Sequence, residues 1–121
     1  MKLRIQGNSL RLRLTRPEVD KLREKGEVAE TATFRLGGNL TYCLQKRAGT
    51  DAVHADLIHG SISISVPAAT VETWVGSDEV GVYAHDGELR IAIEKDFRCL
   101  TRSSEEQEAD AYPHPAERCS A

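Results

Sequence analysis

The sequence has few of the features that mark a membrane protein or a secreted one. Aromatic residues make up 5% of the 121 residues, so we expect a mainly aliphatic core. No apolar run approaches the roughly 18–20 residues that a membrane-spanning helix requires. Residues 1–5 alternate apolar and polar side chains and lack the apolar block of a signal peptide. These features predict a cytoplasmic protein with no membrane partner.

The motifs of common catalytic sites are also missing. The chain has no glycine-rich phosphate loop, no nucleophile elbow and no His-Glu-x-x-His segment. Its three cysteines, Cys43, Cys99 and Cys119, match no zinc-ribbon or Cys-x-x-Cys spacing. In a reducing cytosol we expect free thiols. We therefore lean towards a protein that is not an enzyme.

The most informative positive feature is an internal repeat. Residues 9–22 align with residues 61–74 at an offset of 52 without a gap. Leu12 then falls on Ile64, and Val28 falls on Val80. With a three-residue gap, the alternating segment after Gly38 falls on the one after Gly87.

Each copy has the pattern of two strands, a helix and two more strands. Alternating side chains predict strands at 2–5, 10–14, 27–35, 40–46, 53–58, 61–66, 79–84 and 88–95. Thr15, Pro17 and Glu18 form a helix-start signal, Gly26 ends that first helix, and a second helix is expected at 67–75.

The predicted class is α+β, with duplicated ββαββ units. We expect about eight antiparallel strands in a barrel or a sandwich, with two short helices. Residues 1–98 form one domain with copies at about 1–47 and 52–98, and residues 99–121 form an irregular acidic tail.

The apolar positions of these patterns give a predicted core. It comprises Leu3, Ile5, Leu10, Leu12, Leu14, Val19, Leu22, Phe34, Leu40, Tyr42, Leu44, Leu57, Ile62, Ile64, Val66, Val71, Trp74, Val80, Val82, Leu89, Ile91 and Ile93. The opposite arrangement, with polar faces inside, would give a tunnel lined by Lys2, Arg4, Arg11, Arg13, Arg35, Arg90, Glu94 and Lys95.

Charge is divided unevenly along the chain. Residues 1–47 carry a net charge of +6 and residues 48–121 carry −9, within a total of −3. The basic strand residues Arg4, Arg11 and Arg13 are the predicted partner-binding surface, and the acidic tail is a candidate mimic that competes for it. Overall acidity argues against nonspecific nucleic-acid binding. We expect a protein or small-molecule partner, and a monomer or homodimer.

The start of the tail offers a candidate metal or thiol site. Cys99, Glu106, Asp110 and His114 supply a thiolate, two carboxylates and an imidazole, a mixture that zinc or a similar divalent ion accepts. Their spacing matches no known ligand template. The alternative is a half-buried cysteine followed by solvated acidic residues.

Most of the chain resembles an uncharacterised bacterial family of small proteins, a domain of unknown function. The resemblance rests on residues 1–5 (MKLRI), 7–14 (GNSLRLRL), 94–100 (EKDFRCL) and the Asp, Tyr and Pro positions of 110–115. It implies no activity, substrate or catalytic residue.

A shorter segment, residues 7–22, is similar to the strand–helix opening of AbrB-type swapped-hairpin DNA-binding domains. In that family two chains build one barrel, and here the repeat would supply both halves. The second copy has Ser63 and Ser65 where the first has Arg11 and Arg13.

Three functional hypotheses follow. The leading one is a small non-catalytic binding or accessory protein. The second is a metal- or thiol-dependent enzyme that uses Cys99 and the acidic tail. The third is a nucleic-acid-binding regulator of the AbrB kind.

Overall fold

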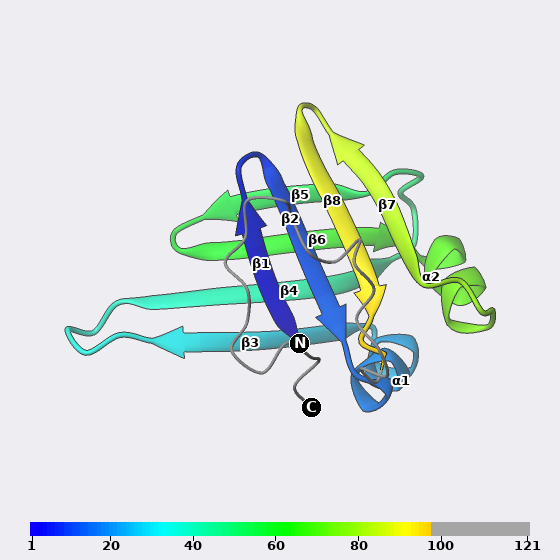
Figure 1. The fold of residues 1–121 in the computed structure, drawn as a ribbon, viewed down its shortest axis with the longest axis horizontal. Helices are drawn as coiled ribbons and strands as arrows, with labels where there is room; N and C mark the ends of the chain where they lie inside the picture. The colour runs from blue at the N-terminus through cyan, green and yellow to red at the C-terminus, as the bar shows by residue number, and fades with distance from the viewer. Residues whose placement is uncertain (98–121) are drawn as a thin grey trace, which may run out of the picture.

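The computed structural model describes residues 1–97, which form eight strands and two helices in two layers (Figure 1). In chain order the elements are β1 (Lys2–Gln6), β2 (Ser9–Leu14), α1 (Arg16–Lys25), β3 (Glu27–Thr33), β4 (Asn39–Arg47), β5 (His54–Ile58), β6 (Ser61–Pro67), α2 (Ala68–Val75), β7 (Gly81–Asp86) and β8 (Leu89–Lys95). None of the helices in this part of the chain is long and apolar enough to cross a membrane.

Each sheet combines a hairpin from one half of the chain with a hairpin from the other half. Sheet A has the strand order β1-β2-β8-β7, and sheet B has the order β3-β4-β6-β5. The predicted repeat is confirmed, because each sheet joins the first hairpin of one copy to the second hairpin of the other. The two sheets form an open sandwich whose strands cross (Figure 1), and they do not close into a barrel.

The central pairing of each sheet is parallel. The strands β2 and β8 run in the same direction with Leu12 opposite Ile93, and β4 and β6 do so with Leu44 opposite Ile64. The expected antiparallel pairing holds within every hairpin and is wrong at these two junctions. A tight turn forces its own two strands to be antiparallel, whereas the direction of the next hairpin is set by long-range packing.

Strand register gives the exact correspondence between the halves. The repeat alignment matches Ser9 with Ser61 and, after the three-residue gap, Thr41 with Arg90. The strands agree with it, because Ser9 lies opposite Arg90 in sheet A and Ser61 lies opposite Thr41 in sheet B. Val28 of β3 pairs with Leu44 of β4. In the other sheet Val82 of β7 pairs with Ile93 of β8, so Val82 is the equivalent of Val28. The predicted match of Val28 to Val80 is therefore wrong, because the second half has a longer connection between its helix and the next strand.

Most of the predicted core is buried between the sheets and under the helices. Leu12 and Ile64, equivalent residues of the two halves, are 0% and 1% exposed. The structure adds Met1, Val28 and Val53 to this core.

Four predicted core residues are instead exposed. These are Ile5, Phe34, Leu57 and Val80, with exposed fractions of 49–71%. Phe34 follows β3 in the hairpin that projects past sheet A, and Ile5 and Leu57 lie near the turn ends of the edge strands β1 and β5 (Figure 1). Crossed sheets overlap mainly at their centres, so an apolar residue near a strand end lacks a partner from the other layer.

The polar strand faces point outward, and the sheets enclose the aliphatic core. Leu10, Leu12 and Leu14 of β2 are buried, while Arg11 and Arg13 between them are only partly buried. The predicted aliphatic core is therefore confirmed, and the opposite arrangement, a polar tunnel, is wrong. The physical reason is the cost of placing several like charges in a small interior without enough counter-charges.

Candidate functional site on the outer face of sheet A

The outer face of sheet A presents its side chains in three rows across four strands. Residues that lie opposite one another in neighbouring strands share a face, so the register defines each row. The first row is Lys2, Arg13, Glu94 and Gly81; the second is Arg4, Arg11, Ala92 and Tyr83; the third is Gln6, Ser9, Arg90 and His85.

The predicted partner-binding arginines lie on this one face. Arg4 of β1 is directly opposite Arg11 of β2, and Arg13 is opposite Lys2. Sequence reasoning left Arg90 out of the binding surface, although the alternation in β8 places it on the polar side. Its position beside β2 depends on the pairing of hairpins from opposite ends of the chain, and no local pattern carries that information.

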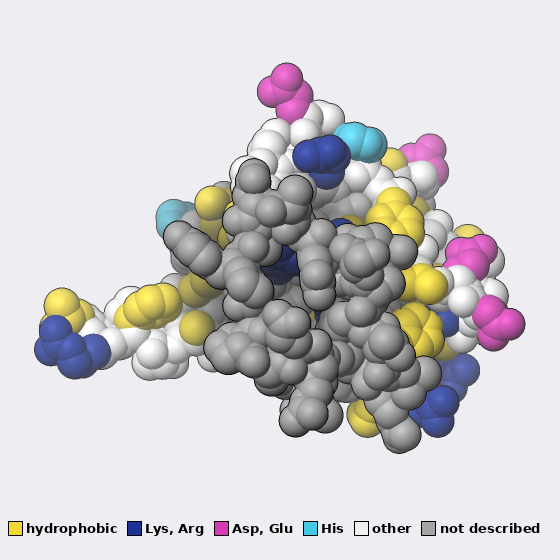
Figure 2. Space-filling model, viewed as in Figure 1, with side chains coloured by type: hydrophobic (Ala, Val, Ile, Leu, Met, Phe, Trp, Pro, Cys, Tyr) yellow, Lys and Arg dark blue, Asp and Glu magenta, His cyan; other side chains and the backbone are white. Residues whose placement is uncertain are grey.

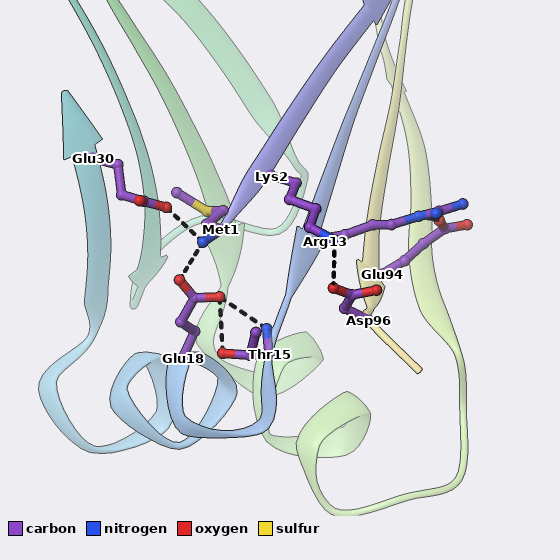
Figure 3. Close-up of polar contacts among 8 residues, drawn as sticks. All are labelled: Met1, Lys2, Arg13, Thr15, Glu18, Glu30, Glu94 and Asp96. Atoms are coloured by element: carbon purple, nitrogen blue, oxygen red, sulfur yellow. Dashed lines mark hydrogen bonds and ion pairs between the residues drawn. The ribbon is translucent and has the colours of Figure 1, made fainter. Parts of the chain in front are cut away.

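A buried carboxylate balances the first row. The side chain of Glu94 is 12% exposed, and Nε of Arg13 donates a hydrogen bond to its Oε1 at 3.3 Å. The buried Nε of Arg11 lies 3.3 Å from the same oxygen without hydrogen-bond alignment. Lys2 pairs with Asp96 at 3.2 Å beyond the end of β8 (Figure 3). The charges of this row therefore largely cancel.

Arg4 of the second row and Arg90 of the third row keep their positive charge. Arg4 donates a hydrogen bond to Oε1 of Gln6 at 3.0 Å, a neutral acceptor. Within residues 1–97, neither Arg4 nor Arg90 forms an ion pair. Both are exposed, as is His85 beside Arg90. Figure 2 shows a basic side chain beside a histidine near the β7–β8 turn, with an acidic side chain at the tip.

These two rows line a hollow of about 530 Å³. Its walls include Arg4, Arg11, Arg90, Tyr83 and His85, and the small side chains of Ser9 and Ala92 lie between them. The arrangement places three guanidinium groups around an open polar space. Guanidinium groups bind phosphate and carboxylate oxygens through paired hydrogen bonds, so the hollow suits an anionic group.

The equivalent face of sheet B has no lysine or arginine in the same three rows. These rows are His54, Ser65, Gln45 and Glu27; Asp56, Ser63, Cys43 and Ala29; and Ile58, Ser61, Thr41 and Thr31. The same strand order and register thus form with serine in place of Arg11 and Arg13, threonine in place of Arg90 and aspartate in place of Arg4. The positive charge of sheet A is not a requirement of the fold.

Tyr83 lies along the sheet surface in a fixed position. Its hydroxyl donates a hydrogen bond to Oε2 of Glu94 at 2.8 Å. A Cβ on Gly81 would stand 2.7 Å from the backbone oxygen of Ile93, 2.9 Å from Cγ of Glu94 and 3.0 Å from the Tyr83 hydroxyl, so this position of β7 needs a glycine. Burial and the neighbouring Glu94 carboxylate raise the pKa of Tyr83, which keeps its hydroxyl protonated. The residue as a whole remains 61% exposed.

Two polar contacts join the sheets at their edges. The Met1 ammonium pairs with Glu18 of α1 and Glu30 of β3 (Figure 3). Burial lowers the pKa of this ammonium, but hydrogen bonds to the two carboxylates outweigh burial and raise the pKa above its ordinary value. At the other edge, the backbone N–H of Ala55 donates to Asp86 at 2.9 Å, which lowers the pKa of that carboxyl.

The carboxylate of Glu18 also caps the N-terminus of its own helix, α1. Burial raises the pKa of Glu18, and hydrogen bonds from the Met1 ammonium and from Thr15 outweigh it and lower the pKa. The backbone N–H of Thr15 donates to Oε1 of Glu18 at 2.8 Å, so the predicted helix-start signal is confirmed. One carboxylate thus holds both the start of α1 and the residue just before β1.

The predicted metal or thiol site lies outside the described residues. Cys99, Glu106, Asp110 and His114 all belong to residues 98–121, as does the acidic run of the predicted tail. Within residues 1–97, no three His, Cys, Asp or Glu side chains gather in a group that would hold a metal ion. The metal site and its divalent ion therefore stay predictions.

A family model matches residues 1–116 of the chain. The chain belongs to this family, a family of unknown function (DUF7009). No curated protein and no solved structure matches the chain. The resemblance to a domain of unknown function is confirmed, and the AbrB-type resemblance stays a prediction. Membership of the family assigns no activity, so the function has to be argued from the site.

Proposed function

We propose that the protein is a binding module and that the outer face of sheet A recognises a negatively charged partner. The observation that carries this proposal is the difference between two equivalent faces. Arg11 and Arg90 in sheet A correspond to Ser63 and Thr41 in sheet B, on the same strand order and register. Glu94 gives Arg11 and Arg13 a role in the fold, whereas Arg4 and Arg90 pair with no carboxylate among residues 1–97, so a role in binding accounts for them.

The balance of charges on the face supports a local site. Glu94 and Asp96 offset the charges of Lys2 and Arg13, while Arg4 and Arg90 line the hollow with no carboxylate paired to them among residues 1–97. The chain carries a net charge of −3, so attraction arises from this face and not from the whole molecule. At physiological salt such attraction acts over about 8 Å. Binding is therefore expected to be specific to this face and to weaken as salt rises.

The cytoplasm is part of the same proposal. Cys43 is a half-buried free cysteine in β4, which is common in a reducing compartment. Phosphate- and carboxylate-bearing molecules and acidic protein surfaces are all available there as anionic partners.

Calorimetric titration with inorganic tripolyphosphate tests the proposal. The informative variant is Arg4→Gln/Arg90→Thr, because neither arginine supports Glu94 and both are exposed. Loss of two charge-assisted hydrogen bonds lowers the affinity about tenfold or more. The matched control is Arg35→Ser/Arg47→Ser, which removes two exposed arginines from the region of sheet B.

The proposal predicts that the control variant binds like the original protein and that higher salt weakens binding of both. Equal losses in the two variants would mean that only total charge matters. No measurable binding by the original protein at low salt would contradict the proposal directly.

A further inference from the structure

We propose that the hollow on sheet A takes a small phosphorylated molecule with a planar ring, the chemical class of a nucleotide. This inference rests on the proposed function and adds the ligand class. The phosphates lie among Arg4, Arg11 and Arg90, and the ring stacks on Tyr83. Two independent features of the face lead to it, the placement of the tyrosine ring and the spacing of the arginines.

The ring of Tyr83 is a preformed stacking surface. Its hydroxyl is held at the level of Gly81 and Glu94, so the side chain extends along the sheet and does not stand away from it. The hydrogen bond uses the hydroxyl and leaves Tyr83 61% exposed. An exposed aromatic ring held in one position stacks on a planar ligand with little loss of side-chain entropy.

The equivalent position in sheet B lacks a ring. Register places Ala29 of β3 where Tyr83 stands in β7, and Glu27 where Gly81 stands. The tyrosine and the arginines therefore occur together on one face and are all absent from the equivalent positions of the other. The hydrogen bond to Glu94 accounts for the hydroxyl but not for the exposed ring, so the ring beside the arginines supports a contact with a ligand.

The arginines of the hollow come from three adjacent strands. Arg4 is on β1, Arg11 on β2 and Arg90 on β8, and neighbouring strands lie about 4.8 Å apart. The three side chains therefore start from points spread over roughly 10 Å across the sheet. One carboxylate cannot neutralise three guanidinium groups at that spread, whereas a short chain of phosphates can. Planar guanidinium groups also suit phosphate oxygens in geometry.

The size of the hollow favours a small ligand over a long polymer. Its volume of about 530 Å³ is within the usual range for small-molecule sites. Ser9 and Ala92 have small side chains that let a ligand approach the sheet. The row of Lys2, Arg13 and Glu94 lies next to the hollow, and Glu94 offsets its positive charge. The positive surface therefore does not continue along the strands.

The test compares three probes by calorimetry at one salt concentration: adenosine triphosphate, inorganic tripolyphosphate and a single-stranded oligonucleotide. Tyr83→Leu removes the ring, and Tyr83→Phe is its matched control, because both variants lose the hydrogen bond to Glu94. Adenosine triphosphate is expected to bind about fivefold or more tightly than tripolyphosphate. Tyr83→Phe keeps this preference and Tyr83→Leu loses it. Thermal unfolding of each variant checks that the fold is intact.

Each outcome has a distinct meaning. Equal binding of adenosine triphosphate and tripolyphosphate, both sensitive to Arg4→Gln/Arg90→Thr, would overturn the ring-bearing ligand and leave the proposed function standing. Insensitivity of both probes to the arginine variant would overturn the proposed function itself. Much tighter binding of the oligonucleotide would overturn the small-molecule class and assign the same phosphate and ring contacts to a single strand.

Discussion

Arg11 of β2 and Ser63 of β6 occupy equivalent positions in the two halves of the molecule. Each lies on a central strand of its sheet, opposite Ala92 in one case and Cys43 in the other, in a parallel pairing of the same register. The chain thus contains its own comparison: one face with arginines and one without, on the same framework. This relationship allows the arginines to be exchanged for residues that the fold already accepts.

The first prediction concerns stability and Glu94. In Arg11→Ser/Arg13→Ser the buried carboxylate loses both cationic neighbours, so the free energy of unfolding falls by about 1–3 kcal/mol. Adding Glu94→Gln gives sheet A the residue that sheet B has there, Gln45, and recovers part of this loss. Urea unfolding of the double and triple variants measures the difference. A triple variant less stable than the double variant would contradict the role assigned to Glu94.

The second prediction separates the observed core from the expected one. Leu12 is fully buried, so Leu12→Ala lowers the free energy of unfolding by about 2–5 kcal/mol. Ile5 alternates in the same hairpin but is 57% exposed, so Ile5→Ala changes stability by only about 0.5 kcal/mol. Chemical denaturation of both variants is the measurement. A large loss in Ile5→Ala would mean that this strand end is covered in solution.

The third prediction concerns pH and the contact between Met1 and Glu18. The pKa of the Met1 ammonium is raised by folding, so its contribution is complete below about pH 8 and is lost as pH rises through the raised value. The pKa of Glu18 is lowered, so its contribution is complete above its ordinary value, about 4.3, and is lost as pH falls through the lowered value. Stability from this pair therefore peaks between those limits.

The variant Glu18→Gln tests this pH dependence. It is expected to lower stability at neutral pH and to reduce the losses at both pH extremes. Glu24→Gln changes an exposed residue of the same helix and is the control. Free energies of unfolding measured from about pH 4 to about pH 10 check the prediction. Parallel pH curves for the original protein and Glu18→Gln would show that the pair has no such effect.

The fourth prediction concerns the acidic residues beyond the described part of the chain. If the segment of Glu105, Glu106 and Glu108 competes for the basic face, replacing all three with glutamine tightens tripolyphosphate binding about two- to fivefold. Replacing Glu24, Asp51 and Glu79 with their amides removes the same charge elsewhere and is the control. Equal effects of the two triple variants would indicate a general charge effect and exclude competition.

The local structure followed from the sequence because local patterns encode it. The capping residues Thr15 and Glu18, the ending of α1 at Gly26 and the alternation in β2 all predicted the elements that are observed. The parallel pairing of β2 with β8 depends on contacts between distant hairpins, which alternation does not report. The exposure of Phe34 depends on how far one sheet extends past the other, which is equally non-local.

The part of the candidate site that lies within one hairpin was predictable from the sequence, and the part contributed by the other half of the chain was not. Arg4, Arg11 and Arg13 belong to one hairpin, so the alternating pattern was enough to place them on one face. Arg90 and Tyr83 come from the other half of the chain and reach this face only because the halves exchange hairpins. The balancing role of Glu94 has the same origin, since its partners Arg11 and Arg13 are far away in sequence.

The central claim is that the outer face of sheet A binds anions, and an NMR titration tests it most directly. Backbone amide shifts of the isotope-labelled protein are followed as inorganic tripolyphosphate is added at low salt. The account predicts saturable shifts concentrated on β1, β2, β8 and β7 around Arg4, Arg11 and Arg90, with sheet B unaffected. Shifts of similar size on the outer face of sheet B, or shifts that do not saturate, would contradict it.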